Sequence, residues 1–415
     1  MNAFRKHCLA ATAGVFAVWS APALAQATDQ PTEGAQPQRS ASYIDLTAGL
    51  GYSSNPFLEF NGDGSAFGRV GARGVHAWSS ERASTSIAAF AEGSTYFNKY
   101  DFKSIFSVTG DTQYEASETI RVFASGGVSG DLSGQLSNRF LYVPPVPEVP
   151  DVTLPPPPVT VQDPDLFSFA GRQYRLYGQG GAAIRTGPRT NITLSGGASR
   201  VWFTGDFLND YTTVFVNGAY NHQLSERTSI GFNVGADRTN YDNSSDHSTI
   251  ISPRLTLSTR LSEYWDIQGG IGVSFSRFQR DGESDHSTSL VFDGSICHSS
   301  ETERLCGRIA RSSQSLSRAA LSNSSSVNVD WYKRLDDKQT VQLSTGVTRY
   351  VTDDQLTSNF KSHYFRIAAS YSRKINGRLS GGADVSGRWL RQNGPDPDGD
   401  LTGSLFLRYR LGDLG

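Results

Sequence analysis

The stretch from Leu261 to Ser287 alternates apolar and polar residues before it reaches an acidic, glycine-bearing patch. The apolar residues share one parity: Trp265, Ile267, Ile271, Val273 and Phe275. A period of two predicts a strand with one apolar and one polar face, whereas a helix would need a period of 3.6. The same period returns at 229–237, 251–261 and 404–411, and the acidic patch is expected to be an outer loop.

The N-terminus predicts a secretory signal, residues 1–25, that is cleaved after export. Arg5 and Lys6 precede an apolar run, and small residues occupy positions 23 and 25. Residues 26–41 are polar and aperiodic, so a flexible periplasmic tail is expected there. The chain is therefore expected to leave the cytoplasm.

Short polar turns divide the alternating stretches at nearly equal intervals. Their anchors are Glu81, Glu118, Pro188, Glu226, Glu263, Glu301, Asp336 and Asn376. One longer polar patch lies between each pair of turns, so eight short turns and nine long loops require eighteen antiparallel strands, with sixteen as the alternative. Both chain ends then lie on the short-turn side. Such a pattern is typical of outer-membrane β-barrels.

The composition changes this picture little. The 415 residues include 42 Gly and 11% aromatic residues, the net charge is -2, and the mean hydropathy is -0.38. A barrel can be this polar because only alternate residues face lipid. A nucleic-acid-binding protein would carry a basic surface, which the charge argues against. The sequence thus predicts an all-β, up-and-down transmembrane barrel over residues 42–415, in the outer membrane of a Gram-negative bacterium.

The tryptophans that follow the signal all share the apolar parity of their strands. Trp78, Trp265 and Trp331 stand beside short turns, while Trp202 and Trp389 stand beside long loops. Indole rings prefer the boundary between hydrocarbon and headgroups, so two aromatic girdles are predicted. A soluble β-sandwich, the alternative, would favour tryptophan at mid-strand.

Three stretches resemble a known family: the run from "LSERTSIGFNVGADRTNY" to "GGIGVSFSR", then "YKRLDDKQTVQLSTGVTRY", and finally "GSLFLRYRLGD". They are similar to the β-barrel porin family of alphaproteobacteria, often encoded beside exopolysaccharide export genes. The resemblance covers residues from about 168 to the end and lies in strand rhythm and turn sequence. It implies a barrel that serves as a porin-like exit for exopolysaccharide. The partners expected are outer-membrane lipid, lipopolysaccharide, the barrel assembly machinery, and periplasmic polysaccharide export and co-polymerase proteins.

An eighteen-strand barrel is too wide for its side chains to fill, so an aqueous channel is expected. Inward parity gives the pore-lining candidates: Arg254, Arg260, Arg388, Arg408, Arg410, Asp237, Asp266 and Asp384. Mixed charge favours a hydrated polymer or a small polar solute over strict ion selectivity. Alternatively, these side chains only hydrogen-bond one another and stiffen the wall. Besides polysaccharide export, a general solute porin and a structural or adhesive barrel with a closed lumen stay open.

A proline-rich insertion, residues 131–165, falls in the third long loop. Its prolines favour an extended polyproline II path and prevent pairing in a central strand. It is interpreted either as a lid over the mouth or, preferably, as a solvated hairpin.

No catalytic residue, metal or cofactor is predicted. Asp396, Asp398 and Asp400 alternate as calcium ligands do, but Pro397 departs from the EF-hand pattern, so solvated loop carboxylates are expected. The two "DHS" triplets, 246–248 and 285–287, place His and Ser on opposite sides of an extended chain. An outer-membrane hydrolase is therefore the least favoured function.

Cys297 and Cys306 flank one short turn symmetrically. A symmetric hairpin places them opposite each other at a Cα separation of ~4.5 to 5.5 Å, within disulfide range. The periplasm is oxidising. A disulfide across this hairpin is therefore predicted, against the alternative of two small apolar residues that face outward.

Overall fold

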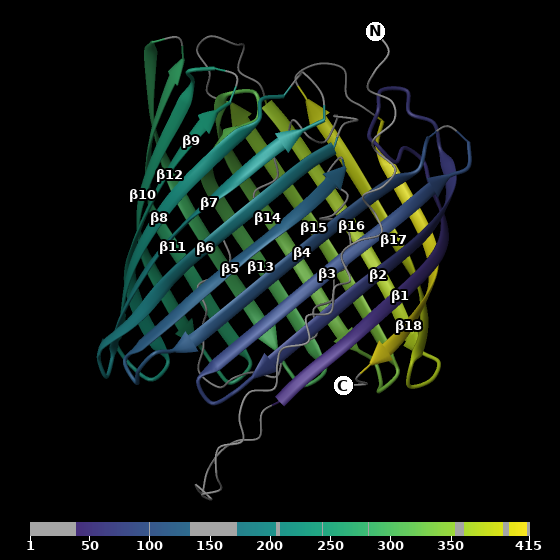
Figure 1. Cartoon of the computed structure of the whole chain (residues 1–415), viewed down its shortest axis with the longest axis horizontal. Helices are drawn as coiled ribbons and strands as arrows, with labels where there is room; N and C mark the ends of the chain where they lie inside the picture. Colours follow the sequence, from purple (N-terminus) through teal and green to yellow (C-terminus); the bar gives the residue numbers. More distant parts are fainter. Residues whose placement is uncertain are drawn as a thin grey trace, which may run out of the picture. The chain divides into compact units, whose positions relative to one another are not determined.

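The chain forms a closed barrel of eighteen antiparallel strands (Figure 1). The computed structural model describes residues 39–98, 100–132, 172–204, 208–242, 244–280, 282–352, 361–392 and 398–412. Each strand pairs with the next one in sequence, and β18 pairs with β1 to close the sheet. The predicted fold and strand number are confirmed. No helix among the described residues is long and apolar enough to cross a membrane.

The strand bounds are β1 (Arg39–Ser53), β2 (Ser65–Ser79), β3 (Ala83–Tyr96), β4 (Lys103–Glu115), β5 (Ile120–Leu132), β6 (Arg172–Gly187), β7 (Thr190–Phe203), β8 (Tyr211–Gln223), β9 (Thr228–Tyr241), β10 (His247–Arg260), β11 (Trp265–Arg280), β12 (Glu283–Ser299), β13 (Glu303–Leu316), β14 (Ala320–Arg334), β15 (Gln339–Thr352), β16 (Lys361–Lys374), β17 (Leu379–Gln392) and β18 (Asp400–Gly412). The barrel begins at Arg39, three residues before the predicted start at 42. The signal 1–25, nearly all of the predicted tail 26–41, and residues 133–165 of the proline-rich insertion lie outside the described residues.

All eight predicted short turns connect strands at one rim, where β1 begins and β18 ends. At the other rim, two of the expected long loops are short: the β11–β12 connection and the β13–β14 connection. Arg280 and Glu283 pair directly across the β11–β12 connection, and Gly282 has a φ of 88°. The expectation of an acidic outer loop at 283–287 is wrong, because Gly282 adopts the positive φ that a tight turn needs and β12 begins directly after it, at Glu283.

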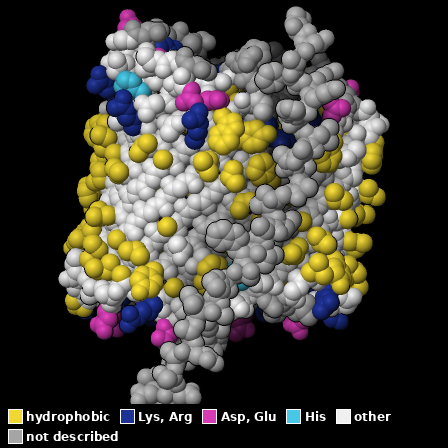
Figure 2. Space-filling view, viewed as in Figure 1, with side chains coloured by type: hydrophobic (Ala, Val, Ile, Leu, Met, Phe, Trp, Pro, Cys, Tyr) yellow, Lys and Arg dark blue, Asp and Glu magenta, His cyan; other side chains and the backbone are white. Residues whose placement is uncertain are grey.

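Alternate residues separate the two faces of the wall. On β10, for example, Ile251, Leu255 and Leu257 are exposed hydrophobic side chains, while Arg254 and Arg260 share the other parity. On the face shown in Figure 2, hydrophobic side chains are scattered over the wall and gather mainly toward its upper and lower parts, between two rims that carry charged side chains. This is the surface that a lipid bilayer requires of a barrel. The buried hydrophobic clusters instead lie at the long-loop rim, on the lumen side of the wall.

Candidate channel and its mouth

The connection between β1 and β2, residues 54–64, folds into the lumen; we call it the mouth loop. Phe57 belongs to a buried cluster with Phe67 of β2, Tyr96 of β3, Ile105 of β4 and Leu132 of β5. Leu58 is fully buried against inward side chains of β15 to β17, which are Tyr350, Tyr364 and Leu390. The nine adjacent strands from β15 to β18 and from β1 to β5 make up half of the eighteen-strand wall. The mouth loop therefore contacts half of the circumference.

A buried ion pair fixes the mouth loop to the last two strands. Nη2 of Arg388 lies 2.8 Å from Oδ2 of Asp400 and also donates to the carbonyl oxygen of Pro56 at 2.9 Å. Asp400 in turn accepts hydrogen bonds from Ser53 Oγ at 2.6 Å and from the Asn55 backbone N–H at 3.2 Å. Both charged side chains are almost completely buried. The carboxylate is thus paired and hydrogen-bonded at once, which a buried charge requires.

Asn55 stabilises the mouth loop from within. Its Nδ2 donates to the carbonyl oxygens of Glu59 at 2.8 Å and Asp398 at 2.9 Å, and its Oδ1 accepts from the Glu59 N–H at 3.0 Å. Leu58 has a φ of 53°, in the left-handed region that a leucine rarely adopts. Surrounding contacts must hold such a backbone in place. Burial of the Leu58 side chain provides them.

The other half of the mouth contains the tip of the β13–β14 hairpin, residues 316–321, which we call the mouth hairpin. Ala319 and Leu321 pack with Tyr241 of β9, Ile250 of β10 and Phe278 of β11. Its backbone carbonyls are held by donors from these neighbouring elements: Tyr241 Oη to Leu316 at 2.8 Å, Asn209 N–H to Ser317 at 2.9 Å and Arg280 Nη2 to Ala319 at 2.5 Å. The mouth hairpin thus lies against strands that are not its neighbours in the sheet.

The mouth loop and the mouth hairpin together narrow the lumen at the long-loop rim. A smaller cluster of Val201, Phe203 and Leu208 adds to the same rim beside Tyr211. The sequence did not identify these segments as inward-folding. The signal was present in the mouth loop, where Pro56, Phe57, Leu58 and Phe60 are apolar residues in a connection between strands.

All eight pore-lining candidates lie at the parity opposite to the exposed hydrophobic side chains. Arg410 makes a bidentate pair with Asp45, with Nε 2.7 Å from Oδ1, and its guanidinium lies 4.2 Å from the ring centroid of Tyr43. Asp384 accepts from Arg69 Nη2 at 2.7 Å. Arg408 lies close to Asp45, Asp384, Arg410 and Arg73.

The remaining candidates are spread along other strands. Arg254 Nη1 lies 3.2 Å from Asp293 Oδ1. Arg260 and Asp266 are register partners on β10 and β11, while Asp237 lies between Phe215 of β8 and Ile250 of β10. Arg388 holds the mouth loop, so its guanidinium is not exposed to a passing solute. Asp45, Arg69 and Asp293 have the same parity and were missed, although the alternation would have identified them. That any of these residues lines a conducting pore stays a prediction.

The five tryptophans lie at the outward parity, close to the rims that the sequence assigned to them. Each has an outward aromatic neighbour or a polar partner. Trp78 lies 5.2 Å from His76, Trp265 5.0 Å from His298, Trp202 stacks on Tyr174 at 5.7 Å, Trp389 lies 5.2 Å from Phe365, and Trp331 Nε1 donates to Glu303 Oε1 at 2.7 Å. An interfacial role for these side chains stays a prediction.

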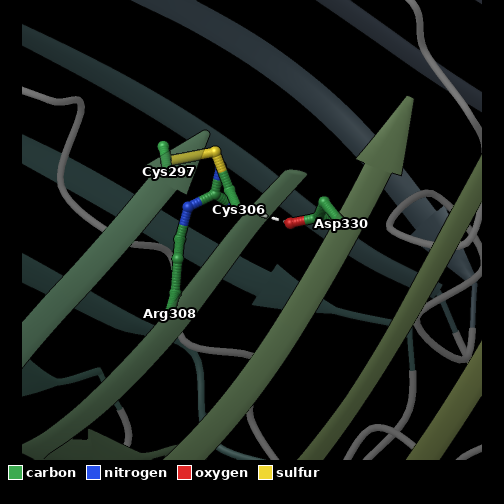
Figure 3. The surroundings of a disulfide bond; sticks show 4 residues. All are labelled: Cys297, Cys306, Arg308 and Asp330. Carbon is green, nitrogen blue, oxygen red and sulfur yellow. Dashed lines mark hydrogen bonds and ion pairs between the residues drawn. A yellow bond between two sulfur atoms is a disulfide. The ribbon is translucent and has the colours of Figure 1, made fainter. Parts of the chain in front are cut away.

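The predicted disulfide between Cys297 and Cys306 is present. The two residues are direct register partners on β12 and β13, with a Cα separation of 4.1 Å. They lie at the inward parity, not the outward parity of the alternative interpretation. Figure 3 shows the ion pair of Arg308 and Asp330 beside them, 2.6 Å between Nη1 and Oδ2. The disulfide therefore staples the hairpin close to its short turn.

Metal and hydrolase interpretations find no support in the described part of the chain. No three His, Cys, Asp or Glu residues are grouped there as a metal site requires. Asp396 lies outside the described residues, and Asp398 contributes its backbone carbonyl to Asn55. The expectation of solvated loop carboxylates is wrong for Asp400, because the mouth loop covers it and Arg388 neutralises it.

Comparisons with known proteins concern the fold alone. No family model matches the sequence, and no curated protein matches it. OccK9 (OpdG) of Pseudomonas aeruginosa is 10% identical, with 90% of this chain and 98% of that chain covered and a TM-score of 0.47. OpdK of Pseudomonas aeruginosa, solved with vanillate, is 10% identical with 90% and 99% covered and a TM-score of 0.46. OccAB2 of Acinetobacter baumannii is 7% identical with 90% and 98% covered and a TM-score of 0.45. The resemblance to the alphaproteobacterial porin family therefore stays a prediction.

Proposed function

We propose that the protein is an outer-membrane channel for small polar solutes rather than an exit for exopolysaccharide. The observation that carries this proposal is the narrowed mouth, where the mouth loop packs between strands that make up half of the wall and the mouth hairpin packs against β9, β10 and β11. A hydrated polysaccharide needs a wide, continuous route. Two inward segments with apolar anchors favour solutes that are short enough to pass between them.

The outer surface supports a place in the membrane. Large hydrophobic side chains are exposed at alternate positions around the barrel, and charged side chains gather at the rims. In water such a surface would be costly, whereas hydrocarbon stabilises it. Closed antiparallel barrels with short turns at one rim are the form in which strands span the outer membrane.

The wall formed by β1, β2, β17 and β18 suggests a preference for anions. Arg69, Arg73, Arg408 and Arg410, which we call the arginine cluster, share this wall with the carboxylates Asp45 and Asp384. Guanidinium groups therefore outnumber carboxylates locally, and a wall with an excess of one charge attracts the opposite ion. Small carboxylate-bearing solutes fit this arrangement.

Conductance across planar bilayers tests the proposal directly. We expect the purified protein to conduct with a reversal potential that indicates anion selectivity, and Arg408→Gln with Arg410→Gln to shift that potential toward neutrality. A double variant, Phe57→Ala with Leu58→Ala, should raise conductance because the mouth loop loses both apolar anchors. Leu405→Ala, an outward residue on the same barrel, is the matched control and should change neither property.

Two outcomes would contradict the proposal. If neither the native protein nor the double variant at Phe57 and Leu58 conducts, a structural or adhesive barrel would be favoured. Passage of long dextran chains through the native protein in liposome swelling would return the polysaccharide exit to first place.

A further inference from the structure

The ladder between β12 and β13 ends halfway up the wall. The two strands pair from Ser299 with Arg304 up to Phe292 with Arg311. Beyond that point β12 continues from Val291 to Glu283 and pairs only with β11, while β13 continues to Leu316 and pairs only with β14. Among the described strands, these two sequence neighbours leave the longest stretches unpaired; β4 and β5 also part before their ends, but over only two or three residues each. We call the unpaired stretch between β12 and β13 the seam.

At the seam, the upper part of β13 lies inside the barrel rather than beside β12. Ser313 and Ser315 have the outward parity of β13, yet they contact inward side chains of other strands. Ser313 Oγ lies 2.8 Å from Oγ of Ser289 on β12, and the Ser315 hydroxyl contacts that of Ser248 on β10. The outer face of β13 therefore packs on the inner face of β10 to β12, which carries the mouth hairpin into the lumen.

The vacant positions on β12 match the displaced part of β13. Continuing the observed register would pair residues 312–316 of β13 with residues 291–287 of β12, without any insertion. The outward side chains of the unpaired part of β12 are Leu290, at its lower end, and the polar residues Thr288, His286 and Ser284 above it. Above Leu290 the β12 edge is therefore flanked by polar outward side chains of its own strand, and water can bind its backbone groups there while the ladder is unformed.

We propose that the mouth hairpin is a gate that opens when β13 completes its ladder with β12. Pairing along the seam would draw residues 316–321 away from Tyr241, Ile250 and Phe278 and clear that half of the mouth. The two arrangements exchange one set of hydrogen bonds for another, since the carbonyls of Leu316, Ser317 and Ala319 leave their donors as the ladder forms. Such an exchange is what an element with two stable positions requires. This inference rests on the proposed channel function.

The native disulfide supplies the template for a test. Ser289 and Gln314 would be direct partners in the completed ladder, eight positions along the strands from Cys297 and Cys306. An even displacement preserves the type of antiparallel pair and the inward parity of both side chains. A disulfide between Ser289→Cys and Gln314→Cys would therefore hold the gate open. In the matched control, Ser289→Cys with Ser313→Cys, the disulfide would hold the gate closed, because these two side chains meet in the present structure.

The experiment uses the full-length protein in planar bilayers, with each cross-link mapped by mass spectrometry before and after reduction. We expect both pairs to form disulfides under oxidising conditions. The oxidised Ser289 and Gln314 pair should conduct about twofold more than its reduced form, because half of the mouth is cleared. The oxidised control pair should conduct no more than its reduced form. The native protein, treated with the same reductant, corrects for loss of the Cys297–Cys306 bond.

The outcomes separate the gate from the channel. Failure of the Ser289 and Gln314 pair to cross-link, while the control pair does, would show that the ladder never completes and would overturn the gate. Cross-linking with equal conductance in both pairs would also overturn it. Cross-linking of both pairs in a barrel that never conducts would contradict the proposed channel, and with it any gating of solutes.

Discussion

Arg388 and Asp400 form a buried ion pair that joins the last two strands to the mouth loop. Asp400→Asn would leave the Arg388 guanidinium without its counter-charge in a buried site. We expect a loss of about 3 to 5 kcal/mol in the free energy of unfolding, measured by tryptophan fluorescence in urea, together with a higher conductance. Arg254→Gln breaks the partly exposed pair with Asp293 and is the control, with an expected loss of roughly 1 kcal/mol or less. Equal losses in the two variants would contradict a special role for the buried pair.

Gly49 allows the side chain of Arg69 on β2 to reach Asp384 on β17 across β1 and β18. A Cβ at position 49 would lie 3.1 Å from Arg69 Nε and 2.7 Å from the carbonyl oxygen of Leu405. Gly49→Ala should therefore displace Arg69, lower the unfolding free energy by about 1 to 3 kcal/mol, and shift the reversal potential. Gly403→Ala, where a Cβ meets nothing within 4 Å, should do neither. If Gly49→Ala had the unfolding free energy and reversal potential of the native protein, the wall would accommodate the added methyl group without displacing Arg69.

The Cys297–Cys306 disulfide should stabilise the folded barrel because it restricts the unfolded chain. Replacing both residues by serine is expected to cost about 2 to 3 kcal/mol, from the loop-closure entropy of so short a loop. Mass spectrometry of unreduced protein should find both thiols protected from alkylation. Alkylation of both thiols without reductant would contradict the bond.

Asp336, in the turn between β14 and β15, should give a pH-dependent contribution to stability. The Lys338 backbone N–H donates to its carboxylate at 2.7 Å, and this bond, with further donation from Gln339, holds the pKa of Asp336 below its ordinary value. The contribution is thus complete at neutral pH and is lost as the pH falls through the lowered pKa. Unfolding of Asp336→Asn, measured from neutral to acidic pH, should lack this component, whereas Asp337→Asn should keep it.

The alternation predicted the barrel well because parity is a local property. Trp265 and Arg254 reveal their faces through their nearest neighbours, and Cys297 and Cys306 reveal their pairing through the symmetry of one hairpin. The mouth was not predictable in this way. Asp400 has the inward parity, but its burial depends on Ser53 and Asn55, more than three hundred residues away in the chain. Periodicity contains no information about such a contact.

The inward course of the mouth hairpin was missed for a related reason. The run from Arg311 to Ser326 is rich in serine and has polar residues at both parities, so alternation assigns it no lipid-facing side. What distinguishes it is the ladder that ends at Phe292 and Arg311. A missing strand pair has no signature in either strand alone.

The buried pair also orders the events of assembly. The mouth loop follows the first strand, but its anchor Asp400 begins the last strand, and Ser53 is 347 residues from it. Loop closure over such a separation is slow and follows the local hairpins. The mouth loop can therefore be anchored only when β18 pairs with β1. The step that closes the barrel thus also fixes the position of the mouth loop in the lumen. A chain that stalls before this step would present two open strand edges and an unanchored mouth loop.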